Sequence, residues 1–175
     1  MDLLDFEAQG LYFDEPDVAG VKELIAEASA QYGGGKAELP LLKAYFKAPE
    51  SLNVLVALNR FYYYQHRLDD ALAATTKALA VIREVVAFPE DWRDLQISHL
   101  QTAPAALLTQ VRLYLFTLKA IGFLHMRLGD LQVSQAIFEK LVGLDSKNRI
   151  GAEALLELVI QRQAELYAAT AQASA

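Results

Sequence analysis

Residues 51–86 read SLNVLVALNRFYYYQHRLDDALAATTKALAVIREVV, and this stretch decides the fold. Apolar residues recur at spacings of three and four before a break at residues 65–67, and small and apolar residues continue a helical rhythm after it. They are Leu55, Leu58 and Tyr62 before the break and Ala71, Ala78 and Leu79 after it. Residues at this spacing share one face of an α-helix. The stretch therefore predicts two helices folded back on each other, a unit that needs neighbours to bury its apolar face.

The same periodicity extends outward in both directions. It predicts further helices over residues 17–32, 37–48, 105–128, 131–144 and 152–169, besides 51–64 and 68–87 in the central stretch. Asp14 and Pro16 suit the start of the first helix, and Pro40 suits the first turn of the second. Residues 89–104 lack a clean period, which predicts a long loop with one helical turn at 92–97. At the end of the chain, a frayed tail is expected after the last helix. The fold class expected is all-α.

Composition narrows the class of protein. The 175 residues suit a single domain, and 54% hydrophobic residues with a mean hydropathy of +0.17 suit closely packed helices and leave a homodimer open. There are 16 Lys and Arg against 22 Asp and Glu, a formal net charge of −6, so we expect no nucleic acid partner. The chain has no cysteine, which removes disulfides, thiolate metal sites and cysteine nucleophiles.

The N-terminus and the longest apolar stretch indicate where in the cell we expect the protein. The chain starts MDLLDFEAQGLYFDEPD, which is acidic and lacks the basic and then apolar regions of a secretory signal. The stretch LYLFTLKAIGFLHM at 113–126 contains Lys119 and His125 and is shorter than the roughly 20 residues that span a bilayer. We therefore expect a cytoplasmic protein without membrane insertion.

Spacing turns the helices into a repeat. Two contiguous frames of equal length cover 18–51 and 52–85, and a third frame of the same length covers 115–148. Small, leucine or aromatic residues, and one proline, stand at matching offsets. They are Leu24, Ala37, Leu41, Ala44 and Pro49 in the first frame, Leu55, Leu58, Tyr62, Ala71 and Ala78 in the second, and Leu118, Ile121, Gly122 and Phe138 in the third.

These offsets resemble the tetratricopeptide-repeat (TPR) family, in a small protein of the bacterial type. Thr75, Ser134, Leu141 and His125 depart from the pattern. The resemblance implies a single domain that forms a right-handed superhelix of antiparallel helix hairpins, with three degenerate repeats. Residues 1–17 would be an N-terminal extension, 86–114 an insertion, and 149–175 a capping helix with a tail.

Candidate catalytic groups do not converge. His66, His99 and His125 are far apart in the sequence and lack the spacing of a metal site. The glycines at 33–35 lack the Lys-Ser/Thr of a phosphate loop, and the acidic pairs stand at helix starts or turns, where carboxylates stabilise the free N–H groups. We nominate no catalytic residue, metal ligand or cofactor, and expect that the protein is not an enzyme.

The resemblance also implies a binding site. In the family, the first helix of each repeat lines a concave groove, and the matching positions here are Lys22, Asn53, Arg60, Tyr63, Tyr64, Phe116, Lys119, Phe123, Met126 and Arg127. This aromatic and basic wall suits a protein or peptide segment with apolar and acidic residues. Tyr63 and Tyr64 could instead pack against a neighbouring repeat or the insertion. Ala26, Ala57 and Ala120 stand where the subclass that grips chaperone C-termini completes its carboxylate clamp, so that function is rejected.

Three functions remain at this stage. The first is a non-catalytic scaffold that binds a protein or peptide in its groove. The second is a chaperone of a hydrophobic client, similar to the translocator chaperones of type III secretion, although the insertion at 86–114 argues against it. The third is a helical domain that binds a small molecule or metal through His125, Tyr63 and the Trp92 loop.

Overall fold

Helices form all the regular structure in the computed structural model, which describes residues 18–31 and 36–173. The α-helices are α1 (Val21–Ala30), α2 (Glu38–Lys47), α3 (Leu52–Tyr64), α4 (Leu68–Val86), α5 (Ile97–Thr102), α6 (Leu108–Leu128), α7 (Leu131–Leu144) and α8 (Glu153–Ala173). Two single 3₁₀ turns, η3 (Trp92–Asp94) and η4 (Ala105–Leu107), flank α5. The described ranges contain no strand, so the all-α prediction is confirmed.

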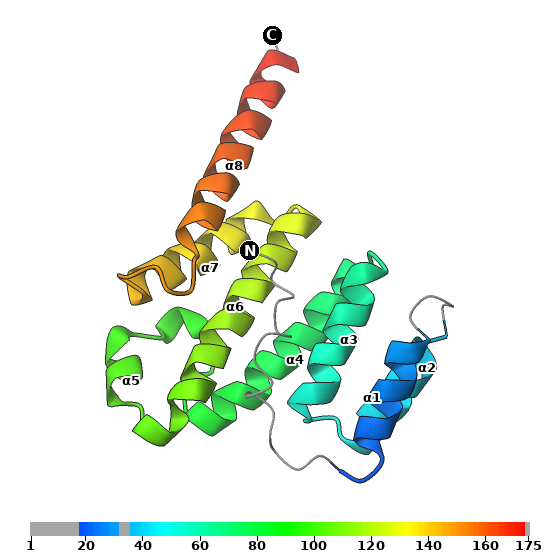
Figure 1. Ribbon diagram of the computed structural model, residues 1–175. Helices are drawn as coiled ribbons and strands as arrows, with labels where there is room; N and C mark the ends of the chain where they lie inside the picture. The colour runs from blue at the N-terminus through cyan, green and yellow to red at the C-terminus, as the bar shows by residue number, and fades with distance from the viewer. Residues whose placement is uncertain (1–17, 32–35, 174–175) are drawn as a thin grey trace.

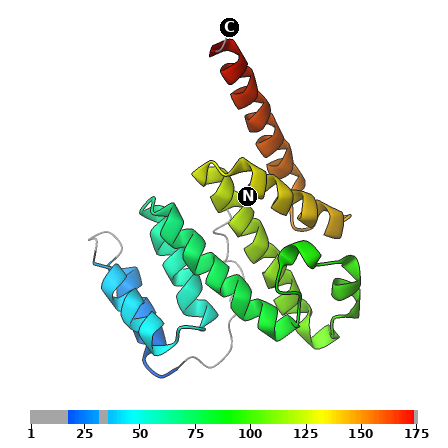
Figure 2. The same cartoon turned by 180° about the vertical axis from the view of Figure 1, so that it is seen from behind.

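The helices are arranged as a row in chain order. Each of α1, α2 and α3 packs on the next helix, α4 packs on both α3 and α6, and α7 lies between α6 and α8. Figures 1 and 2 show α1 and α2 at one end of this row and α8 projecting from the other. Short α5 lies beside the first half of α6 (Figure 1).

Most helix ends follow the local sequence signals. The Ser51 hydroxyl accepts a hydrogen bond from Val54 N at 3.4 Å and caps α3, and Asp130 caps α7 through Val133 N at the same distance. Gly129 has a φ of 89°, which allows the sharp end of α6. Pro40 lies in the first turn of α2, where its missing N–H has little cost. The predicted bounds of 131–144 are confirmed, and α3 ends at residue 64 as predicted but begins one residue later, at Leu52, after the Ser51 cap.

Two helix starts differ from the prediction by more than one residue. The first helix begins at Val21, after Gly20 with a φ of 86°, rather than at residue 17. The predicted cap at Asp14 and Pro16 lies outside the described residues. The long helix begins at Leu108 rather than Ala105, because residues 105–107 form a separate 3₁₀ turn.

The insertion has more structure than the predicted loop. It contains η3 and α5, and a reciprocal cap starts α5: the Gln96 side chain accepts from the backbone of His99, and His99 Nδ1 accepts from Gln96 N at 2.9 Å. It also contributes to the core, since Phe88 and Leu95 are buried. The insertion is therefore an integral part of the domain.

The last helix is longer than predicted, because α8 continues to Ala173 instead of ending near residue 169. Gln163 Nε2 donates a hydrogen bond to Leu131 O at 3.1 Å, and this contact anchors the middle of α8 to the start of α7. Beyond this point the alanine-rich sequence has high helix propensity, which favours continuation of the helix.

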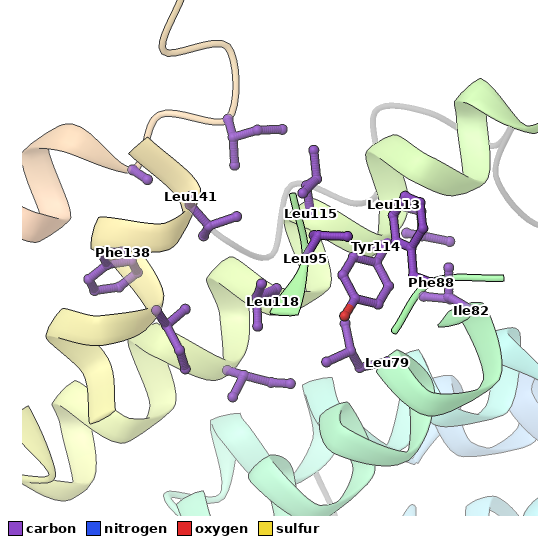
Figure 3. Close-up of a cluster of buried hydrophobic side chains, with 14 of the residues drawn as sticks. Leu79, Ile82, Phe88, Leu95, Leu113, Tyr114, Leu115, Leu118, Phe138 and Leu141 are labelled. Carbon is purple, nitrogen blue, oxygen red and sulfur yellow. The ribbon is translucent and has the colours of Figure 1, made fainter. Parts of the chain in front are cut away.

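The core consists of two clusters that meet at α4 and α6. The larger one joins α4, the insertion, α6, α7 and α8, and the smaller one joins α1 to α4 with Leu124. Figure 3 shows Tyr114 within the larger cluster. Its side chain is 1% exposed, and its ring lies edge-on to Phe88 with the centroids 5.1 Å apart.

The segment Ala105–Leu128 is long and apolar enough to cross a membrane by length and composition alone, with a mean hydropathy of 1.3. It is longer than the apolar stretch at 113–126, so the short length of that stretch does not exclude membrane insertion. In the structure, 61% of its most apolar window is buried against other parts of the protein. Packing on α4 and α7 therefore accounts for its apolar composition.

Candidate binding surface on α3 and α6

Three side chains predicted for the groove meet where α3 and α6 end. The ring centroids of Tyr63 and Phe123 are 6.3 Å apart. Arg127 Nη1 donates a hydrogen bond to Tyr63 Oη at 3.1 Å, and the guanidinium carbon lies 5.8 Å from the Tyr63 centroid and 6.0 Å from that of Phe123. Because Tyr63 is far from the other two residues in the sequence, the packing of the helices creates this cluster of rings and cation.

Tyr64 extends the cluster toward solvent. It is 50% exposed, and its ring packs edge-on against Tyr63 with the centroids 5.9 Å apart. We define the Tyr63–Arg127 surface as Tyr63, Tyr64, Phe123 and Arg127. It combines exposed ring area with a guanidinium group, so it can pack against an apolar side chain and bind a carboxylate at the same time.

A second cation–ring pair lies on the same side of α6. The Arg112 guanidinium carbon is 5.4 Å from the Phe116 centroid. Arg112, Phe116, Phe123 and Arg127 follow one another at spacings of four, seven and four, so they form one stripe along the helix, which we call the α6 stripe. Arg112 was missed in the sequence because the repeat frame starts at residue 115. The spacing of four residues between Arg112 and Phe116 is the sequence signal that could have identified Arg112.

Two residues predicted for the groove are instead buried, so the prediction that they line an open groove is wrong. Lys119 and Met126 are each 3% exposed. The Lys119 amine donates a hydrogen bond to Ile150 O at 2.5 Å and lies 5.0 Å from the Phe116 centroid. Burial lowers the pKa of Lys119 from its ordinary value. The loop before α8 covers the Lys119 amine at Ile150, whereas Arg112 and Arg127 on the α6 stripe stay exposed, and Met126 belongs to the larger core cluster.

The remaining predicted residues lie on α3 and α1. Asn53 and Arg60 are partly exposed on α3 and recur with Tyr64 at spacings of seven and four, so they share its side of the helix. Lys22 is exposed on α1. No contact among the described residues joins it to the Tyr63–Arg127 surface.

The groups proposed for a small-molecule or metal site are not brought together. His125 Nδ1 lies 3.2 Å from Asp130 Oδ2 at the end of α6, whereas Trp92 packs beside α7. His66 occupies the turn between α3 and α4 with a φ of 58°. Within residues 18–31 and 36–173, no group of three or more His, Cys, Asp or Glu side chains could hold a metal ion.

An open pocket of about 490 Å³ lies between the insertion and α7. It is lined by Trp92, Arg93, Leu95, Ala136, Glu139, Lys140, Gly143 and Leu144. The Lys140 amine donates hydrogen bonds to Arg93 O at 2.6 Å and Leu95 O at 3.2 Å, so it holds the insertion against α7. The insertion therefore lies beside the first half of α6 and away from the C-terminal end of α3 (Figure 1).

Comparison with known proteins gives one informative relative. The chain is 40% identical over 166 residues to an uncharacterized 19.8 kDa protein in the nifW 5′ region of Azotobacter chroococcum mcd 1. The chain belongs to the family of this protein. The alignment covers 95% of this chain and 93% of the relative, so the similarity extends over nearly the full length of both proteins. No family model matches the chain, and no solved structure gives a significant match.

Proposed function

We propose that this protein is a non-catalytic, cytoplasmic TPR-like scaffold that binds a protein or peptide segment on the Tyr63–Arg127 surface. The observation that carries the proposal is the meeting of Tyr63, Phe123 and Arg127 at the ends of α3 and α6. Aromatic and arginine side chains are the types most enriched among residues that dominate binding energy.

The positions of the helices support the repeat. Helices α4 and α7 begin at Leu68 and Leu131, which stand at the same offset from the starts of the frames 52–85 and 115–148. Helices α1 and α3 end at Ala30 and Tyr64, which likewise share one offset from the starts of the frames 18–51 and 52–85.

The packing within the third frame gives further support. Ser134 Oγ donates a hydrogen bond to Gly122 O at 2.8 Å, so the two small residues stand at the contact between the paired helices. A Cβ atom on Gly122 would lie 2.8 Å from the Phe138 ring. Close approach of this kind is the physical role that small residues have in a helix hairpin.

The chemistry of the surface indicates the kind of partner. The rings of Tyr63, Tyr64 and Phe123 offer area for an apolar anchor, and Arg127 offers donors for a carboxylate. We propose a segment with apolar and acidic residues as the ligand. Because the relative is in the nifW 5′ region, the product of nifW is the first defined partner to test.

Affinity capture with a paired variant tests the proposal. The variant Tyr64→Ala/Arg127→Ala changes two exposed residues, and Lys119 is left intact because it is buried. We expect it to bind the captured partner at least about 30-fold more weakly, because the loss of a single hot-spot residue of this type already costs about 2 kcal/mol. The matched control Lys43→Ala/Phe46→Ala removes an exposed cation and ring from α2 and should leave binding unchanged.

A particular result would overturn the proposed site. If both paired variants retain the wild-type helix content and unfolding midpoint and bind the partner as tightly as the wild type, the Tyr63–Arg127 surface is not where the partner binds.

A further inference from the structure

The acidic character of the protein is confined to its N-terminal segment, residues 1–17. This segment contains six Asp and Glu and no Lys or Arg, which equals the whole formal net charge of −6. The rest of the chain has 16 acidic and 16 basic residues and is formally neutral. The same segment contains two apolar triplets, Leu3-Leu4-Phe6 and Leu11-Tyr12-Phe13, among its carboxylates. It therefore has the composition that we propose for a ligand of the Tyr63–Arg127 surface.

The complementary surface has cations that pair with rings rather than carboxylates. Among the described residues, Arg112 and Arg127 have no carboxylate partner, and their guanidinium groups lie against Phe116 and the Tyr63–Phe123 pair. Three arginines elsewhere are paired with carboxylates: Arg83 with Glu84, Arg93 with Asp91, and Arg67 with Glu38 and Asp70 at 2.7 Å. The α6 stripe thus combines two cations, each of which could pair with a carboxylate, and two rings, each of which could pack against an aromatic side chain.

We propose that residues 1–17 of the same chain bind to the α6 stripe together with Tyr63 and Tyr64. The apolar triplets would pack on the rings, and the carboxylates would pair with Arg112 and Arg127. The inference rests on the proposed function of this surface and identifies its resident ligand. An outside partner must then displace the segment, so its apparent affinity is reduced by the fraction of chains in which the surface is occupied.

The length of the segment permits this contact. A segment as long as 1–17 can span up to about 55 Å when extended. It joins the described chain at Val18, just before α1, and α1 packs on α3. Helix α3 has 13 residues and is therefore about 20 Å long, which is well within reach. A tethered ligand of this length also has a high effective concentration at the surface.

A single spin label tests the proposal in the full chain. Since the protein has no cysteine, Ala8→Cys introduces one labelling site, and it lies between the two apolar triplets. A nitroxide on this cysteine should reduce the amide NMR signals of Tyr63, Tyr64, Phe123 and Arg127. The signals of Lys140 and Gly143 on α7, beside the insertion, should keep their intensity and serve as the internal control.

Charge variants show whether the contact is specific. Adding Arg112→Glu/Arg127→Glu to the labelled chain should restore the signals of Tyr63 and Phe123, as should high salt, which screens exposed charges. The control pair Lys43→Glu/Lys47→Glu makes the same change of charge on α2 and should leave the signal loss in place. Equal signals with and without an active nitroxide at Tyr63 and Phe123 would overturn the proposal.

Mixed samples identify which chain supplies the segment. A spin-labelled chain without NMR isotopes is mixed with an isotope-labelled chain that lacks cysteine. Signal loss in this mixture would mean that a second copy supplies the segment and would overturn the assignment to the same chain. If the nitroxide has no effect but Tyr64→Ala/Arg127→Ala abolishes partner binding, this inference fails and the proposed function stands. If the nitroxide acts as expected but that variant binds its partner normally, the proposed function fails instead.

Discussion

Gly122 marks the closest contact between α6 and α7. A Cβ atom there would lie 2.8 Å from the Phe138 ring and 2.9 Å from Ile137 Cγ2. Both neighbours are fully buried, so neither can move without disturbing the larger core cluster. Glycine suits this position because the packing leaves no room for a Cβ atom.

Replacing Gly122 tests this contact. We expect Gly122→Ala to lower the free energy of unfolding by about 1–3 kcal/mol through overpacking. Gly143→Ala is the matched control in the same helix pair, because no atom lies within 4 Å of its Cβ position. It should raise the free energy of unfolding by about 0.5–1 kcal/mol, because alanine favours helix. Urea unfolding measures both, and equal effects would contradict the account of close packing.

Because Lys119 is buried, we expect the free energy of unfolding to change with pH in the alkaline range. Burial lowers its pKa below the ordinary 10.5, so between the two values the unfolded chain binds more protons than the folded one. The free energy of unfolding contributed by Lys119 should rise with pH across this window and be smallest below it. We expect the difference between wild type and Lys119→Met in urea unfolding to shift in favour of the wild type as the pH approaches 10.5. A difference that stays constant with pH would contradict this.

At the scale of the elements, Lys140 connects the insertion to α7. Its amine bonds to Arg93 O and Leu95 O, and a charged donor of this kind contributes about 1.5–3 kcal/mol. We expect Lys140→Met to speed hydrogen exchange at the amides of Asp94 and Leu95, which donate hydrogen bonds within η3. Lys147→Met removes an exposed lysine from the turn after α7 and should leave these amides unchanged. Unchanged exchange in Lys140→Met would show that the insertion is held by its apolar contacts alone.

The sequence predicted the elements whose signals are local. The bounds of α3 and α7 could be read from apolar spacing with the Ser51 and Asp130 caps, since both signals lie within a few residues of the helix. Helix α5 could not, because it starts from an unusual Gln96–His99 cap, and the segment just before it is held at Leu95 by Lys140, which comes from a distant part of the chain.

The candidate site was predictable only in part, because contacts between distant parts of the chain leave no local signal in the sequence. The repeat offsets nominated Tyr63, Phe123 and Arg127, which the structure brings together. They also nominated Lys119, whose burial depends on how the loop at Ile150 folds over α6. Neither apolar spacing nor repeat position contains that information, since the covering loop lies outside the repeat frame.

The proposed partner site at the ends of α3 and α6 lies in the middle of the helical row (Figure 1). Exposed aromatic residues occur elsewhere too: Phe46 on α2 is 82% exposed and Tyr167 on α8 is 81% exposed, against 50% for Tyr64. Exposure alone would therefore favour the two ends of the helical row over the Tyr63–Arg127 surface.

Site-specific photo-crosslinking separates these alternatives most directly. A benzophenone amino acid is placed at position 46, 64 or 167 of the full chain, and the three variants are irradiated with the captured partner. We predict that the partner crosslinks at position 64 and at neither of the other two. Crosslinking at position 46 or 167 with none at position 64 would contradict the claim.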